Sequence, residues 1–181
     1  LPAWRPGRYE LANFAKNIQQ FSVKTLNNKP LFFEKVTKDK WRIYTGKSKK
    51  IKIEYNYYAN ELNAGSTWVD ENQIYVNPVN CCLYVEGRAQ DSIKLFFNKT
   101  NHKQAATSLQ KIGDHFVAEN FDELADSPFI LSDSLKHNSY VINDTKFNIW
   151  FQGECKPDWD KIIRDFKAFT KEQLKIFGSF P

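Results

Sequence analysis

The sequence contains no methionine, and it has only three cysteines and three histidines among 181 residues. No run approaches the roughly 18 apolar residues that a membrane-spanning helix needs, so we expect a soluble protein without a membrane span. The missing initiator methionine and the lack of a signal-peptide pattern at the start predict a piece of a larger polypeptide. The compartment, cytoplasmic or exported, stays open, because a signal peptide would precede this piece.

Motifs for metal-dependent and nucleophilic catalysis are missing as well. No two histidines lie four residues apart, so the helical H-E-x-x-H zinc site cannot be built from this chain. The serine nucleophile elbow G-x-S-x-G and the glycine-rich nucleotide-binding patterns are also absent. The histidines, which we interpret as surface or strand residues, are His102, His115 and His137. We therefore predict no catalytic residue and no metal ligand in this chain.

The cysteines lack the paired spacing of a zinc site, in which two cysteines lie two to four residues apart. Cys81 and Cys82 are neighbours, and in an extended strand their side chains would point to opposite faces. We interpret them as small, mostly buried hydrophobic residues. Whether Cys81, Cys82 or Cys155 forms a disulfide is not decided by the sequence.

What the chain does have is aromatic side chains and a moderate positive charge. A hydrophobic content of 41% and an aromatic content of 15% are ample for a packed core. The net charge of +5 raises the possibility of phosphate binding, for which Lys47, Lys49, Lys50 and Lys52 are the candidates. The positive charge is otherwise spread along the chain, so we favour a solvated turn and predict no nucleic-acid partner.

Short strands dominate the pattern of hydrophobic residues. Apolar and polar residues alternate from Ile51 to Tyr58, which is typical of a half-buried strand. Asn143-Asp144 between two apolar runs predicts a hairpin turn, and a second hairpin is expected around Lys38-Asp39. The other predicted strands are Leu31–Val36, Trp41–Tyr44, Gln73–Val76, Cys82–Glu86, Ile93–Phe97, His115–Ala118, Tyr140–Ile142 and Lys146–Phe151.

Helical signals are fewer. Apolar residues at spacings of three and four from Leu11 to Phe21 predict a short helical face. Asn120 with Glu123 resembles a capping box, so a helix of little more than one turn is expected before Pro128. A longer helix is predicted from Pro157 to Phe177, with Gly178 as its C-terminal stop. Many short strands followed by one helix indicate a mainly β fold, a β-sandwich or curved antiparallel sheets with a C-terminal α-helix.

Several segments resemble the N-terminal region of the glycyl aminopeptidase family, zinc metallopeptidases related to aminopeptidase N and thermolysin. The opening LPAWRPGRYELANFAKNIQQFS is similar to that family's first signature. YNYYANELN, VDENQIYVNPVNCCLYVEG, FDELADSPFIL and the closing IFGSFP resemble later family motifs and follow in the same order. The chain departs from the family at Ala64-Gly65-Ser66, where many members carry a Val-Arg-containing segment, and at Asn77-Pro78, where Asn-Gly is common.

The resemblance implies a saddle-like β domain ahead of a thermolysin-type catalytic domain that binds zinc. We expect residues 1–152 to form the β-sandwich N-terminal domain and residues 153–181 to form a linker and the helix that begins the catalytic domain. The resemblance further implies that this chain is a non-catalytic part of an enzyme that removes N-terminal residues, preferably Gly or Ala, from peptides. The expected partners are the catalytic domain and the peptide substrate of the parent enzyme, with self-association through the C-terminal helix as a further possibility. The family resemblance also allows a bent strand in place of the helical face near Phe14.

Candidate substrate contacts lie in the loop-rich stretch between Asn60 and Asn80. Its polar groups could receive the ammonium group of a peptide, and we single out Glu61, Asp70, Glu71 and Asn77. Carboxylates are also common in turns, and no activating partner accompanies these. The alternative is a free-standing β-sandwich module that binds peptides or glycans through the aromatic residues Tyr58, Trp68 and Tyr75.

Overall fold

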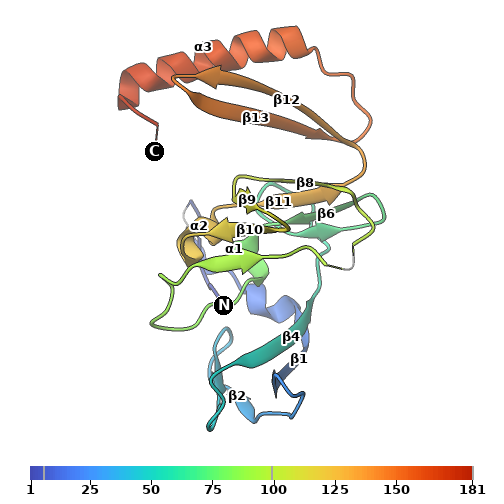
Figure 1. Ribbon diagram of the computed structural model, residues 1–181, viewed down its shortest axis with the longest axis vertical. Coiled ribbons are helices and arrows are strands. Elements are labelled where there is room, and N and C mark those ends of the chain that lie inside the picture. Colours follow the sequence, from blue (N-terminus) through green and yellow to red (C-terminus); the bar gives the residue numbers. More distant parts are fainter. Residues whose placement is uncertain (6, 99, 181) are drawn as a thin grey trace. The chain divides into compact units, whose positions relative to one another are not determined.

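The computed structural model describes residues 1–5, 7–98 and 100–180 (Figure 1). The chain divides into two compact units, Leu1–Leu131 and Ser132–Pro181, which we describe separately. Pro6 and Pro181, which belong to the first and last family-like motifs, lie outside the described residues.

Two small antiparallel sheets form a lobe of the first unit, at the lower end of Figure 1. Strand β1 (Ile18–Thr25) pairs with β4 (Ile51–Tyr57), and β2 (Phe33–Lys35) pairs with β3 (Trp41–Ile43). The predicted strand beginning at Ile51 and the predicted hairpin between β2 and β3 are confirmed. We call residues 18–58 the N-terminal lobe.

An aromatic cluster joins the two sheets of this lobe. The ring centroid of Phe21 on β1 lies 5.0 Å from that of Phe33 and 4.8 Å from that of Trp41. On its own sheet Phe21 lies 6.1 Å from Tyr55, whose hydroxyl donates a 2.5 Å hydrogen bond to the carbonyl oxygen of Cys81. The lobe is thereby attached to the central part of the unit through a partly buried polar contact.

The helical face predicted from Leu11 to Phe21 is wrong beyond a single turn. The 3-10 helix η1 (Phe14–Asn17) is followed at once by β1, which has a register shift between Gln19 and Ser22. Gln20 lies in this bulge at φ = 52°. Pairing with β4 gives the backbone groups of this segment their partners, and this tertiary pairing overrides the helical spacing. The bent strand that the family resemblance allows is the conformation observed.

The centre of the first unit consists of two further sheets, one with the strand order β5-β6-β11-β8 and one with the order β7-β10-β9. Four of these seven strands, β5, β8, β9 and β11, were not predicted, although β6, β7 and β10, which were, are equally short. The bounds are β5 (Trp68–Val69), β6 (Gln73–Val76), β7 (Ile93–Leu95), β8 (Gln104–Thr107), β9 (Gln110–Ile112), β10 (His115–Ala118) and β11 (Phe129–Ser132).

The core of the first unit is made of two clusters that share Leu95. One cluster centres on Phe121 and Leu124, and the other centres on Phe129 and Leu131. Leu95 on β7 packs against both of them. The predicted strands Gln73–Val76 and His115–Ala118 coincide with β6 and β10, which confirms them.

The strand predicted from Cys82 to Glu86 is wrong. A single helical turn, α1 (Pro78–Cys81), lies just ahead of it, and residues 82–92 form turns and irregular structure. Pro78 occupies the first helical position, where its missing N–H leaves no hydrogen bond unmade. Cys81 packs against the Phe129 cluster and Cys82 against the Phe121 cluster, and both are free thiols.

The predicted capping box is present at α2 (Phe121–Ala125). The side chain of Asn120 accepts a 2.9 Å hydrogen bond from the backbone N–H of Glu123. The Glu123 carboxylate accepts one of 2.6 Å from the N–H of Glu119, one residue earlier than in the usual reciprocal pair. The helix ends ahead of Pro128, as expected.

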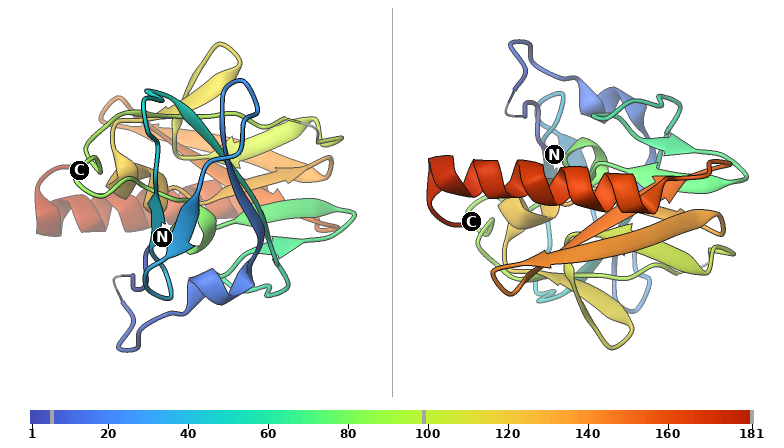
Figure 2. Two further views of the ribbon diagram at one scale, coloured as in Figure 1. Left: turned by 90° about the horizontal axis from the view of Figure 1, so that it is seen from below. Right: turned by 90° about the horizontal axis from the view of Figure 1, so that it is seen from above.

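The second unit is a hairpin covered by one long helix. Strand β12 (Leu135–Ile142) pairs with β13 (Thr145–Gln152), and the turn residues Asn143 and Asp144 have φ values of 48° and 62°. Positive φ at both positions is the signature of a type I′ turn, so the predicted hairpin is confirmed. Figure 2 shows α3 (Trp159–Phe177) running along this hairpin.

Helix α3 begins later than predicted and ends where predicted. Asp158 is its N-cap and accepts a 3.1 Å hydrogen bond from the N–H of Lys161, so Pro157 lies outside the helix. Gly178 ends it with φ = 79°, a conformation that favours glycine. The buried contact between helix and hairpin includes a 2.8 Å hydrogen bond between the hydroxyls of Tyr140 and Thr170.

The predicted class, mainly β with one C-terminal helix, is confirmed, and the paired strands form several small antiparallel sheets. Within the residues that the structure describes, no helix has both the length and the apolar character required to cross a bilayer. The division of the chain after residue 152 into a β domain and the start of a catalytic domain stays a prediction.

Candidate functional site

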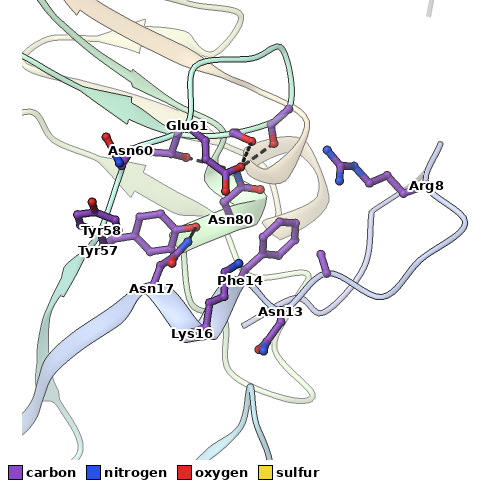
Figure 3. Close-up of a pocket in the computed structure, with 14 residues that line it drawn as sticks. Arg8, Asn13, Phe14, Lys16, Asn17, Tyr57, Tyr58, Asn60, Glu61 and Asn80 are labelled. Carbon is purple, nitrogen blue, oxygen red and sulfur yellow. Dashed lines mark hydrogen bonds between the residues drawn. The ribbon is translucent and has the colours of Figure 1, made fainter.

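Two pockets lie on either side of α1 in the first unit. The smaller one, which we call the polar pocket, has a volume of about 200 Å³ and is shown in Figure 3. Residues from η1, the end of β4, the loop 60–67 and α1 line it: Arg8, Ala12, Asn13, Phe14, Lys16, Asn17, Tyr57, Tyr58, Asn60, Glu61, Gly65, Ser66, Thr67 and Asn80. The predicted site stretch thus meets the N-terminal segment at this pocket.

Two buried asparagines hold the loop that forms one wall of the polar pocket. Asn77 donates a 2.5 Å hydrogen bond to the carbonyl oxygen of Ser66, and Asn80 donates one of 3.0 Å to that of Gly65. Asn80 also donates to the hydroxyl of Thr67 at 3.3 Å. Because Asn77 and Asn80 are three residues apart around α1, both side chains reach the same loop. The loop is therefore fixed by the helical turn beside it.

Hydrogen-bond acceptors are concentrated in this pocket. The carboxylate of Glu61, an exposed residue, accepts a 3.0 Å hydrogen bond from the hydroxyl of Ser66. The side-chain oxygen of Asn80 is buried and has no hydrogen-bond partner among the described residues. A buried acceptor without a donor costs free energy, but this oxygen is closed off from solvent, so the Glu61 carboxylate is the acceptor that a donor entering the pocket would meet.

The rest of the polar pocket combines neutral side chains, among them Asn17 and Tyr57, with the cationic side chains of Arg8 and Lys16. The Asn17 side chain donates a 3.2 Å hydrogen bond to the hydroxyl of Tyr57. Burial raises the pKa of the Tyr57 phenol above its ordinary value, although the bond from Asn17 works in the opposite direction. Tyr57 is therefore uncharged near neutral pH and offers a hydroxyl rather than a base.

Asp70 and Glu71 line neither of the two pockets. The Asp70 carboxylate accepts hydrogen bonds from the indole N–H of Trp68 and from the backbone N–H groups of Asn72 and Gln73, at 2.8–2.9 Å. The indole bond, followed by that of Asn72, holds the pKa of this carboxyl below its ordinary value. Asp70 thus organises the turn between β5 and β6, and Glu71 is exposed on that turn. Their contact with a substrate stays a prediction.

Asn77 and Glu61 lie in different pockets. Asn77 is buried, with 5% of its surface exposed, and borders the second pocket, whereas Glu61 borders the polar pocket. The four candidates of the sequence are therefore distributed over two pockets and one turn. Asn80 was not singled out from the sequence; the signal for it was the Asn77-Pro78 start of a helical turn, which places position 80 beside position 77.

The aromatic residues of the binding-module alternative differ in their surroundings. Trp68 donates its indole N–H to Asp70, and Tyr75 donates its hydroxyl to the carbonyl oxygen of Ala64 at 3.1 Å. Tyr58 is 57% exposed and borders the polar pocket. The polar atoms of Trp68 and Tyr75 are therefore hydrogen-bonded to residues of the neighbouring loops.

The second pocket has a volume of about 580 Å³. We call it the motif pocket, because most of its lining comes from three of the family-like motifs: Pro2, Trp4, Arg5, Asn77, Val79, Tyr84, Ala89, Phe121, Asp122, Ala125, Asp126 and Pro128. Arg5 links the two pockets by donating a 3.1 Å hydrogen bond to the carbonyl oxygen of Gly65. Motifs far apart in the sequence thus meet at one place in the fold.

The residues that the structure describes form no metal centre. Across residues 1–5, 7–98 and 100–180, no group of three or more His, Cys, Asp or Glu side chains is arranged to hold a metal ion. His102, His115 and His137 line neither pocket. The resemblance places the family's zinc in the catalytic domain of the parent protein, which this chain does not include.

Comparison with known proteins identifies the family. Residues 1–133 match the family described as the Peptidase M61 N-terminal domain. A crystal structure of an aminopeptidase N family protein from Idiomarina loihiensis resembles the whole chain, with a TM-score of 0.87 and 26% sequence identity. This chain spans 32% of the length of that protein. No curated protein matches. The chain belongs to the family of M61 peptidase N-terminal domains, as the resemblance of its motifs to the glycyl aminopeptidases predicted.

Proposed function

We propose that this chain is the non-catalytic N-terminal domain of a zinc aminopeptidase that removes N-terminal residues, with a preference for Gly or Ala, from peptides. The family match over residues 1–133 and the likeness to an aminopeptidase N family protein support this assignment. In this proposal the domain supports the catalytic domain and forms part of the side through which substrate enters. The zinc ion and its ligands belong to the catalytic domain.

The observation that carries the proposal is the polar pocket with Glu61 at its rim. A peptide's ammonium group carries three N–H donors, and the Glu61 carboxylate of this pocket is an acceptor for them, while Arg8 and Lys16 line the same pocket as cations. A charge-assisted hydrogen bond to the carboxylate would favour the protonated N-terminus. The small volume of about 200 Å³ suits a small N-terminal residue.

The Glu61→Gln variant of the full-length enzyme tests this role. We expect KM for glycyl or alanyl nitroanilide to rise about tenfold, the loss of roughly 1.4 kcal/mol of charge-assisted binding, with kcat nearly unchanged. Glu71→Gln is the matched control, because Glu71 is exposed and lines neither pocket. An unchanged KM in Glu61→Gln, at an unchanged melting temperature, would remove the polar pocket from the substrate path.

We further propose that residues 153–181 begin the catalytic domain. Helix α3 exposes large apolar side chains, with Phe169 59% and Ile176 75% exposed, and the related crystal structure is about three times longer than this chain. Burying such side chains contributes about 1.5–3 kcal/mol each. Replacing both by Ser in the full-length enzyme is expected to lower its melting temperature; a melting temperature equal to that of wild type would contradict this. Should these side chains pair two copies of the chain instead, sedimentation would show a dimer that the substitutions dissociate.

A further inference from the structure

One end of the N-terminal lobe combines exposed apolar side chains with unpaired lysines. Residues 18–58 contain ten Lys and Arg residues against three Asp and Glu residues, a formal charge of +7 in a chain whose total is +5. The excess positive charge of the protein is therefore located in this lobe. The proposed peptidase function makes no use of it.

The charge is concentrated further in two adjacent segments, 26–32 and 44–50, which we call the lysine tip. They contain Lys29, Lys47, Lys49 and Lys50 and no acidic residue. All four lysines are exposed, and none of them has an ion-pair partner among the described residues. Lys52, by contrast, pairs with Glu54 at 2.8 Å and is not part of the tip.

The strand pairing places the two segments side by side. Thr25 and Ile51 are the last pair of the β1–β4 ladder, so the turn after Thr25 and the loop ahead of Ile51 leave the sheet at the same end. The N–H of Tyr44 donates a 3.0 Å hydrogen bond to the carbonyl oxygen of Phe32, and the two rings lie 5.3 Å apart. The lysines are thus grouped by the fold and not only by the sequence.

Apolar side chains are exposed on the same tip. Leu26 is 63% exposed, Phe32 69% and Tyr44 48%. The Tyr44 hydroxyl donates to Glu34 at 2.8 Å, so its phenol has one polar end and one apolar face. Aromatic side chains of this kind favour the boundary between water and an apolar phase.

We propose that the lysine tip binds the surface of a membrane that contains anionic lipids. Four unpaired ammonium groups would lie against the headgroups, and Leu26 and Phe32 would enter the boundary of the acyl chains. The same lysines could bind nucleic acid, but an exposed leucine gains nothing from phosphates or bases, and the Phe32 and Tyr44 rings already contact each other. The combination of leucine, aromatic ring and lysine favours the lipid surface.

The test measures sedimentation of the full-length protein with vesicles of phosphatidylcholine alone and with vesicles that also contain phosphatidylglycerol, whose negative surface potential attracts basic segments. We expect binding to the anionic vesicles only, weakened as salt rises toward about 0.5 M. A quadruple Lys→Gln variant at positions 29, 47, 49 and 50 is expected to bind at least about a hundredfold more weakly, since each lysine contributes about fivefold. The matched control replaces four exposed lysines of the second unit, Lys146, Lys156, Lys167 and Lys171, and is expected to change binding less than about tenfold.

Insertion is tested separately with Leu26. A Leu26→Trp variant is expected to show an emission shift to shorter wavelength, and quenching by brominated lipids, when anionic vesicles are added. Leu26→Ser is expected to weaken vesicle binding and to leave the melting temperature unchanged, because this side chain is mostly exposed. Equal loss of binding in the control lysine variant would overturn the proposal, as would no vesicle binding at low salt. Tighter binding to a duplex DNA of about 20 base pairs than to vesicles would show that the lysine tip binds nucleic acid instead of a membrane surface.

Discussion

Asn80 donates one hydrogen bond to the carbonyl oxygen of Gly65, at 3.0 Å, while its own side-chain oxygen stays buried without a donor. The residue therefore contributes to stability through its amide nitrogen, while its buried oxygen adds no hydrogen bond among the described residues. The two halves of this side chain can be separated by mutation.

We expect Asn80→Ala to lower the free energy of unfolding by about 1–3 kcal/mol, because the Gly65 carbonyl and the Thr67 hydroxyl lose a buried partner. Asn80→Asp is expected to cost at least as much, since a carboxylate oxygen would face the Gly65 carbonyl. Urea denaturation followed by circular dichroism measures both. Asn27→Ala, in an exposed turn, serves as the control, and a loss in Asn80→Ala no larger than in that control would contradict the assignment.

Gly65 and Arg5 are expected to be energetically coupled. A Cβ atom at position 65 would lie 1.7 Å from a guanidinium nitrogen of Arg5, so Gly65→Ala must displace Arg5 and break its hydrogen bond to the Gly65 carbonyl. The expected cost is about 1 kcal/mol in the wild-type background. In an Arg5→Ala background the same substitution is expected to cost close to zero. Urea unfolding of the four variants gives the coupling, and additive costs would show that Arg5 is not the obstacle.

Tyr55 is expected to make the unfolding free energy pH-dependent in the alkaline range. Burial raises the pKa of its phenol in the folded state, so the folded protein holds this proton more tightly than the unfolded chain does. The stability that results is fully present below the unfolded pKa of about 10 and is lost as the pH rises beyond it toward the folded pKa. Unfolding free energies between about pH 8.5 and 11 are expected to fall more steeply for wild type than for Tyr55→Phe.

The neutral-pH effect of Tyr55→Phe is expected to be a loss of about 1 kcal/mol, because the Cys81 carbonyl loses its 2.5 Å partner. Tyr9→Phe is the matched control, since Tyr9 is fully exposed. Parallel pH profiles for wild type and Tyr55→Phe would refute the assignment to this phenol.

In the second unit we expect Thr170→Val to destabilise the packing of α3 on the hairpin by about 1–3 kcal/mol. The substitution keeps the shape of the side chain but leaves the buried Tyr140 hydroxyl without its 2.8 Å partner. The double variant with Tyr140→Phe removes both polar groups and is expected to recover most of the loss. Thermal unfolding measures this recovery; a double variant less stable than Thr170→Val would argue against the pairing.

The sequence predicted best those features that depend on near neighbours in the chain. The alternation from Ile51, the turn at Asn143-Asp144 and the cap at Asn120 each depend on residues a few positions apart, and each is present in the structure. The helical face near Phe14 failed because pairing with β4, whose partner residues lie 26 to 39 positions further along the chain, decided the conformation of β1. The strand after Cys81 failed because Pro78 starts a helical turn at that point.

The candidate site was predictable in part for the same reason. Glu61 could be named from its place in a polar loop, and the structure puts it at a pocket. Asn80 was missed: the Asn77-Pro78 start of a helical turn places it beside Asn77, but its hydrogen bonds to residues 13 and 15 positions away are not visible in the sequence. The Asp70 carboxylate accepts a hydrogen bond from the N–H of Asn72 within its own turn. A sequence does not distinguish such a carboxylate from one that faces a ligand.

Helix α1, a single turn, separates the polar pocket from the motif pocket, with Asn80 on one side and Asn77 and Val79 on the other. A substitution in this partition therefore alters both cavities at once, and it also releases the loop that Asn77 and Asn80 hold. Independent adjustment of either cavity must come from the outer walls, from η1 and Glu61 on one side and from α2 and Trp4 on the other. The departures of this chain from the family at Asn77-Pro78 and at Ala64-Gly65-Ser66 fall in this partition and in the loop that it holds, so both cavities are expected to differ from those of other family members.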